Sequence, residues 1–166
     1  MSKLVMFYIV PLVVWVGLIY FSSSQPYERQ NVQPILQEFD LEWVETVGSN
    51  VSFKYGDSII SLQYRDPAAF IEFFIRKGAH LFVFAVLGIL AYRLAYILIE
   101  KRMKSAIIAW LFVTIYASID EFSQLLHPNR SGMIEDVILD SVGGIIGVGI
   151  IILWRRRNNR FKVEEK

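Results

Sequence analysis

The sequence predicts an all-α polytopic membrane protein with four transmembrane helices, and three observations lead to this fold class. The 166-residue chain is 54% hydrophobic, and its mean hydropathy of +0.42 is higher than that of ordinary soluble domains. Four apolar runs are each long enough to cross a hydrocarbon core of about 30 Å. Lysine and arginine gather beside alternate ends of these runs, a pattern typical of membrane helices. We treat residues 1–166 as one domain.

The first apolar run, 4–21, follows Lys3. It exceeds the apolar region of a cleaved signal peptide, which is about 7–15 residues long, and it contains Trp15. We therefore predict a retained transmembrane helix.

The polar segment 22–76 is predicted to fold outside the cell. Apolar residues recur at helical spacing within 32–47, which predicts an amphipathic helix. This helix either lies on the membrane surface or packs against the protein itself. Apolar and polar residues alternate over 51–55 and 60–64, with a Gly-Asp turn between them, which predicts a short β-hairpin.

Three more transmembrane helices follow, after a helix start at Asp66-Pro67. They are predicted at 79–99, 105–126 and 134–154. Gly143 and Gly147 lie four residues apart on the last helix, a spacing that predicts close packing against a neighbouring helix. We expect the polar tail, 155–166, to be disordered.

The placement of cations predicts the orientation. The link at 100–104 carries three cations and the tail begins with three arginines, whereas the turn at 127–132 carries only Arg130. Cations in short loops gather on the cytoplasmic side. We therefore predict a multi-pass membrane protein with both termini cytoplasmic and 22–76 outside. The net charge of +1 gives no indication of a nucleic-acid partner.

Ionisable residues of three helices are predicted to lie at one depth. With a rise of about 1.5 Å per residue, Asp120 and Asp140 lie roughly 8 Å and 9 Å below the outer face. Ionisable groups inside a membrane face the bundle interior and pair with one another, because a central Asp costs roughly 2.5–3.5 kcal/mol to insert. We therefore predict a binding site in the outer leaflet formed by Lys77, His80, Asp120, Gln124, Arg130, Asp136 and Asp140.

This group of residues either forms a functional site or only braces three helices. If the site is catalytic, the acid–base candidates are Asp120, Glu121, Asp136 and His80. The chain has no cysteine and two histidines, so any metal site would have to be rich in carboxylates. We predict neither a metal nor a cofactor.

Five blocks of residues resemble the VanZ-like family of small bacterial membrane proteins. They are FSSSQP at 21–26, RKGAHLF at 76–82, DEFSQ at 120–124, PNRSG at 128–132 and DVILDSVG at 136–143. Two positions depart from the family pattern, since Val83 stands where many relatives have Glu and Asp140 where Asn is frequent. The resemblance implies a multi-pass protein of the bacterial plasma membrane, and so a role in the cell envelope. The family's named member is linked to low-level resistance to teicoplanin, a glycopeptide antibiotic with a lipid tail.

Three hypotheses about function remain open. The first is a non-enzymatic protein that binds an amphiphile, such as a membrane lipid, a lipid-linked cell-wall precursor or a lipidated glycopeptide. The second is an enzyme acting on a headgroup, with Asp120 or Glu121 as general base and cationic side chains on phosphate. The third is a lipid or proton-coupled transporter. It is disfavoured because the cytoplasmic halves of the helices lack ionisable groups apart from Arg93.

Overall fold

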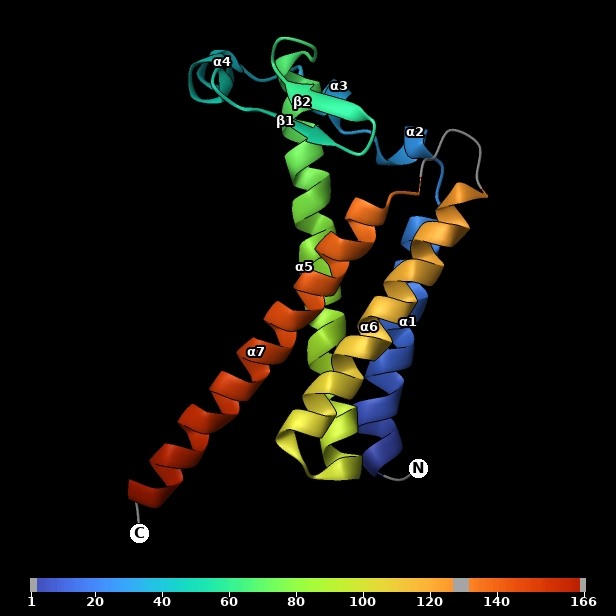
Figure 1. Ribbon diagram of the computed structural model, residues 1–166, viewed down its shortest axis with the longest axis vertical. Coiled ribbons are helices and arrows are strands. Elements are labelled where there is room, and N and C mark those ends of the chain that lie inside the picture. The colour runs from blue at the N-terminus through green and yellow to red at the C-terminus, as the bar shows by residue number, and fades with distance from the viewer. Residues whose placement is uncertain (1–2, 127–131, 165–166) are drawn as a thin grey trace.

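Four long helices stand beneath a small insert in the computed structural model, which describes residues 3–126 and 132–164 (Figure 1). The long helices are α1 (Val10–Ser23), α5 (Pro67–Ile99), α6 (Arg102–Leu125) and α7 (Ile134–Glu164), with a π-helical segment, η1 (Val5–Ile9), before α1. Helix α1 together with η1, and each of the other three helices, is long and apolar enough to cross a membrane. The predicted fold class is confirmed.

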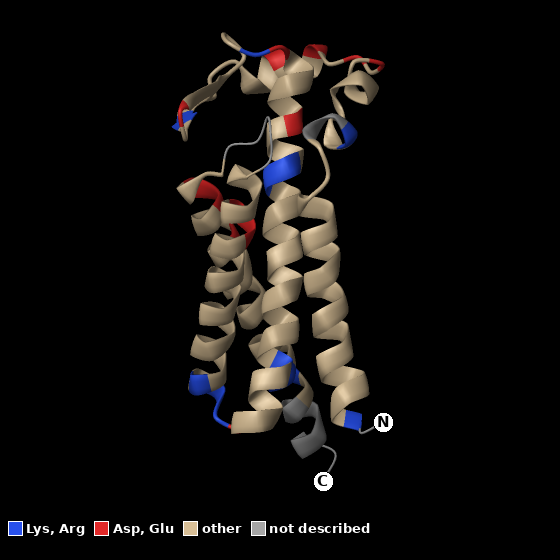
Figure 2. Ribbon diagram, turned by 90° about the vertical axis from the view of Figure 1, so that its right-hand side faces the viewer, with Lys and Arg blue, Asp and Glu red and all other residues tan. Residues whose placement is uncertain are grey.

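The surfaces of these helices suit a lipid environment. Large apolar side chains point outward and are exposed, among them Val13, Phe82, Ile119 and Ile145. Such a surface would be unfavourable in water. Figure 2 shows lysine and arginine near both ends of the molecule, with one group at the end that holds the N-terminus, and most acidic residues of the long helices near the opposite end. We conclude that the protein is embedded in a membrane.

The insert consists of short elements between α1 and α5. They are α2 (Tyr27–Gln30), α3 (Gln33–Leu36), α4 (Glu42–Gly48), β1 (Ser52–Tyr55) and β2 (Ser58–Ser61). The strands pair antiparallel as a hairpin, as predicted. The stretch 32–47 is not one continuous amphipathic helix, because it forms α3 and α4 with a break between them. Asp40 accepts a hydrogen bond from the Glu42 backbone N–H at 3.0 Å, a local bond that competes with helix continuation.

Helix α5 supports the insert. Its 33 residues span about 50 Å, so its first turns extend beyond a hydrocarbon core of about 30 Å. The Asp66 side chain caps its start by accepting a hydrogen bond from the Ala69 N–H at 3.0 Å. Phe70 on these first turns packs with Val44 of α4 and Ile60 of β2 in a buried cluster. The insert is therefore held on the end of a transmembrane helix.

Helix α7 packs closely against α5. A Cβ atom on Gly143 would lie 2.5 Å from the backbone oxygen of Leu81, and one on Gly147 would collide with the backbone of Ala85. The two backbones are thus in direct contact, which confirms the prediction from the glycine spacing.

The tail 155–166 was expected to be disordered, and for its described part, 155–164, this expectation is wrong. Helix α7 continues to Glu164. The extension has neither glycine nor proline and is rich in arginine, a good helix former. Extending an existing helix also avoids the unfavourable nucleation step.

Candidate functional site

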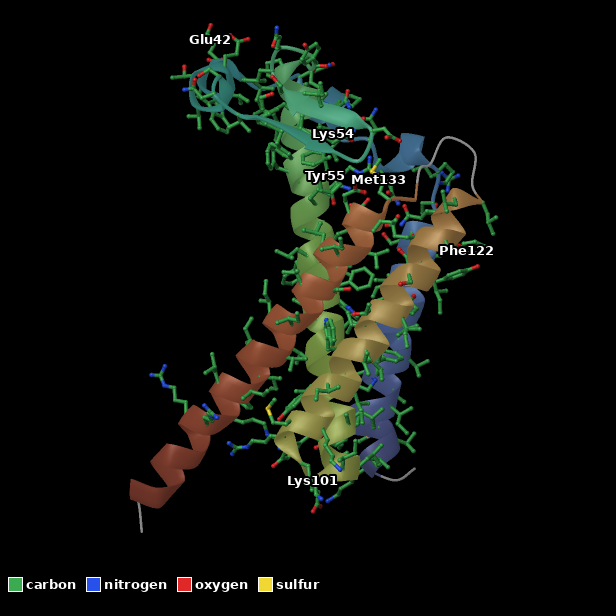
Figure 3. All side chains as sticks on the ribbon, in the orientation of Figure 1. Glu42, Lys54, Tyr55, Lys101, Phe122 and Met133 are labelled. Carbon is green, nitrogen blue, oxygen red and sulfur yellow. The ribbon has the colours of Figure 1, made fainter. Side chains whose placement is uncertain are left out.

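The predicted polar residues gather where α5, α6 and α7 approach the insert. The structure describes six of the seven predicted binding residues: Lys77, His80, Asp120, Gln124, Asp136 and Asp140. The seventh, Arg130, lies outside the described residues. Figure 3 shows Tyr55 of β1 and Met133, which precedes α7, near each other on the side of the insert that faces the long helices. The polar side chains form three clusters, each joining different elements.

The first cluster joins α5, α7 and the hairpin through Asp136, which is buried. Lys77 forms an ion pair with Asp136 Oδ1 at 2.5 Å, and the Tyr55 hydroxyl donates a hydrogen bond to the same oxygen at 2.6 Å. The Lys77 ammonium also lies 4.7 Å from the centroid of the Tyr55 ring, within cation–π range. The Lys77 ammonium thus balances the negative charge of Asp136, and the Asp136 carboxylate accepts hydrogen bonds from Lys77 and Tyr55.

Tyr55 remains a hydrogen-bond donor in this cluster. Burial raises the pKa of its phenol above the usual value, and the hydrogen bond to Asp136 and the charge of that carboxylate raise the pKa further. A protonated phenol can donate to a carboxylate, whereas a phenolate would repel it. The hairpin is therefore tied to Asp136 throughout the physiological pH range.

The second cluster joins α1 to α6 through the buried carboxylate of Asp120. The Ser23 hydroxyl donates to Asp120 Oδ2 at 2.9 Å. The Gln124 side-chain amide donates to the same oxygen at 3.1 Å and to Ser23 Oγ at 3.0 Å. These bonds position the end of α1 beside α6.

The third cluster contains His80 of α5, Glu121 of α6 and Asp140 of α7. His80 Nδ1 lies 3.4 Å from Asp140 Oδ2. Glu121 Oε2 accepts a hydrogen bond from the Met133 N–H at 3.0 Å. One ligand atom from each of the three residues lies within 4.8 Å of the others, so the cluster could hold a metal ion.

Two cavities adjoin these clusters. A polar cavity of about 290 Å³ lies between the insert and the outer turns of α5, and its lining includes Tyr55, Arg65, Glu72, Lys77 and Asp136. A mainly apolar cavity of about 400 Å³ lies between α1 and α5, and its lining includes Trp15, Leu18, Ile19, Val83 and Phe84. Arg76 and His80 line both cavities.

The four acid–base candidates differ in their access to these cavities. His80 lines both, Asp136 lines the polar cavity, and Asp120 lines the apolar one. Glu121 is not among the lining residues of either cavity. Because Asp136 Oδ1 already accepts from Lys77 and Tyr55, His80 is the candidate best placed to contact a ligand.

Several residues of the site were not selected from the sequence. Tyr55 and Ser23 act through hydrogen bonds to predicted carboxylates. Glu72 is buried and accepts a hydrogen bond from the Gln33 side chain at 2.5 Å. A signal for Glu72 was present, because it is the one carboxylate in the aromatic-rich stretch 70–75 at the start of a long helix. Ser23 belongs to the FSSSQP block but has no distinguishing feature within it.

Comparison with known proteins identifies a family. The model of the VanZ/LLP1 family matches residues 7–155, which include all four long helices through position 155 and the insert. No match was found among curated proteins or among solved structures.

Proposed function

The chain belongs to the VanZ/LLP1 family, and we propose that it binds a phosphate-bearing amphiphile in the outer leaflet of the plasma membrane. The headgroup occupies the polar cavity beneath the insert, and the apolar chain occupies the cavity between α1 and α5.

One observation carries this proposal: the polar and the apolar cavity have two lining residues in common, Arg76 and His80. An amphiphile has the same arrangement, with a polar head joined directly to an apolar chain. Leu18 lines the apolar cavity and is itself exposed on the outer surface of α1. A chain can therefore enter from the surrounding lipid without crossing a polar barrier.

The charges of the polar cavity favour an anionic headgroup. Its described lining includes three permanent cations, Arg65, Arg76 and Lys77, and two carboxylates, Glu72 and Asp136. Guanidinium groups bind phosphate oxygens through paired hydrogen bonds. Membrane phospholipids and lipid-linked cell-wall precursors both supply a phosphate.

The physiological role proposed from this binding is envelope homeostasis. A lipidated glycopeptide of the teicoplanin type presents a lipid tail to the same apolar cavity, so resistance to such antibiotics is a proposed consequence. The short link between α5 and α6 lies at the end that holds the N-terminus (Figure 1) and has Lys101, Arg102 and Lys104 in or next to it. Short cytoplasmic loops carry such an excess of cations, which supports an orientation with the insert outside.

The orientation can be tested with single cysteines, because the natural chain has none. Asp57 lies exposed in the hairpin turn and Lys101 lies exposed in the link between α5 and α6. Asp57→Cys should react with a membrane-impermeant maleimide in intact cells, and Lys101→Cys only after permeabilisation. The opposite labelling pattern would place the polar cavity on the cytoplasmic side.

Ligand binding can be tested by photo-crosslinking in nanodiscs. The probes are photoreactive phosphatidylglycerol, a photoreactive lipid-linked wall precursor, a photoreactive lipidated glycopeptide and a neutral photoreactive diacylglycerol. Arg76→Gln should reduce labelling by the two phosphate-bearing probes about tenfold or more, because a charge-assisted hydrogen bond contributes about 1.5–3 kcal/mol. Labelling by diacylglycerol should be weak and insensitive to this change.

A second pair of variants tests the apolar cavity. Leu18→Trp fills it, whereas Ile138→Trp enlarges an exposed side chain on α7 that does not line it. Leu18→Trp should block labelling by every probe, and Ile138→Trp should have no effect. Equal labelling of wild type, Arg76→Gln and Leu18→Trp would refute the proposal. The relative labelling by phosphatidylglycerol, the wall precursor and the lipidated glycopeptide would show which of these amphiphiles the site prefers.

A further inference from the structure

The cluster of His80, Glu121 and Asp140 presents an imidazole and two carboxylates from three different helices. We propose that these three side chains bind a divalent transition-metal ion. This inference goes beyond the proposed function and does not depend on it, and the sequence alone predicts no metal site.

The state of Asp140 is the independent observation that points to a cation. Asp140 is fully buried, at 0% exposure, and its Oδ1 atom has no hydrogen-bond partner among residues 3–126 and 132–164. Within the same residues, its other oxygen has one polar contact, to His80 Nδ1 at 3.4 Å, beyond the usual 2.7–3.2 Å for an N–H···O bond. A buried carboxylate with so little compensation is costly. A bound cation removes that cost.

Among the described residues, no lysine or arginine side chain forms an ion pair with the carboxylates of Glu121 or Asp140. Lys77, the nearest lysine along α5, forms an ion pair with Asp136. Glu121 accepts hydrogen bonds from the Met133 backbone N–H at 3.0 Å and from the Gln124 side-chain amide at 3.5 Å. Two buried carboxylates thus share one histidine as their ionisable neighbour in the cluster.

The geometry is close to that of a metal site. Ligand atoms bound to one ion at about 2.1 Å lie roughly 3–4 Å apart, and the three atoms here already lie within 4.8 Å of one another. Side-chain rotations that shorten these separations by about 1 Å would bring the three atoms to the spacing of a bound ion. The three residues stand on helices that pack directly together, so the backbone positions of the ligands are defined.

The donor atoms select the class of ion. One imidazole nitrogen with carboxylate oxygens suits Zn²⁺ or Mn²⁺, whereas an all-oxygen set would favour Mg²⁺ or Ca²⁺. Three protein ligands also leave coordination positions open. Because His80 lines both cavities, an ion bound to it adjoins the proposed ligand site.

The test measures ion binding by the full chain in phosphatidylcholine nanodiscs, with empty nanodiscs as the blank and no other ligand added. Protein stripped with a chelator is incubated with Zn²⁺ or Mn²⁺ alone, desalted and analysed by inductively coupled plasma mass spectrometry. Wild type should retain the ion in stoichiometric amounts. Asp140→Asn and Glu121→Gln should each weaken binding on the order of 100-fold, since loss of even an outer-shell partner costs 10–100-fold.

Glu135→Gln is the matched control, because Glu135 is an exposed carboxylate on α7 outside the cluster. It should retain the ion as wild type does. If wild type retains neither ion, the proposal is refuted. Equal retention by wild type, Asp140→Asn and Glu121→Gln would also refute it. The wild-type measurement is decisive even if a variant misfolds. The lipid-labelling experiment tests the proposed function, and its result does not depend on whether the metal ion is retained.

Discussion

Helices α7 and α1 both pack on α5, but they do so in different ways. The α5–α7 contact brings two backbones together at Gly143 and Gly147, and the Lys77–Asp136 ion pair links its outer end. In α1, Ile19 is the buried residue, and the helix leaves a cavity of about 400 Å³ beside α5. The first contact holds polar groups in fixed positions, and the second leaves room for a ligand.

The hydrogen bonds of α1 show how a loosely packed helix is nevertheless positioned. Trp15 Nε1 donates to the Val83 carbonyl at 3.0 Å, and the Tyr116 hydroxyl donates to the Val16 carbonyl at 2.9 Å. These bonds lie between side chains and backbone, and they do not require close contact of the helix axes. Helix α5 is therefore in direct backbone contact with α7 on one side and borders an open cavity beside α1 on the other.

The largest expected effect comes from placing a side chain at the α5–α7 contact. Gly147→Leu should destabilise the protein by about 3 kcal/mol, because the new side chain would collide with the Ala85 backbone and overpacking typically costs 1–3 kcal/mol. Chemical unfolding in mixed micelles, followed by tryptophan fluorescence, measures the change.

Gly17→Leu is the control on the looser side of the comparison. A Cβ atom on Gly17 of α1 would meet no heavy atom within 4 Å. This variant should unfold at the same denaturant concentration as wild type or slightly later. Equal destabilisation by the two substitutions would contradict the difference between the two contacts.

A smaller effect is expected from the ion pair that joins α5 to α7. Lys77→Met should cost about 2 kcal/mol, less than the 3–5 kcal/mol typical when one partner of a fully buried pair is removed, because the side chains of Lys77 and Asp136 retain 21% and 11% exposure. The same unfolding assay reports the loss. The double variant Lys77→Met/Asp136→Asn should recover part of the stability, since it leaves no unpaired charge. A double variant less stable than the sum of the single changes would argue against a direct pair.

The smallest effect is expected on the α1 side. Trp15→Phe removes the hydrogen bond to Val83 and should cost about 0.6 kcal/mol, the average for such bonds within membranes. Because Trp15 also lines the apolar cavity, the substitution should change amphiphile labelling more than it changes stability. A loss of stability as large as that of Lys77→Met would show that α1 is held as firmly as α7.

The depth of each residue along its helix, calculated from the sequence, predicted which polar residues of the candidate site lie at the same level. The predicted convergence of Lys77, His80, Asp120, Asp136 and Asp140 required only helix rise and chain direction. The pairings among them did not follow, since they depend on how each helix is rotated about its axis. Asp136 pairs with Lys77, and Asp140 contacts His80. Tyr55 was missed because a hairpin residue acquires its partner only when the insert folds onto α5.

The sequence by itself determined the four membrane helices, the hairpin, the close approach at Gly143 and Gly147 and the level at which carboxylates gather, because hydropathy and periodicity are local properties. The break within 32–47 and the helical continuation of α7 depended on competing local hydrogen bonds and helix propagation, which composition alone does not resolve. Only the tertiary structure decided that a polar and an apolar cavity share Arg76 and His80. It also showed that Asp140 is buried, with one oxygen that has no hydrogen-bond partner in the described part of the chain. Both features arise from distances between segments remote in the chain, and such distances are set by packing.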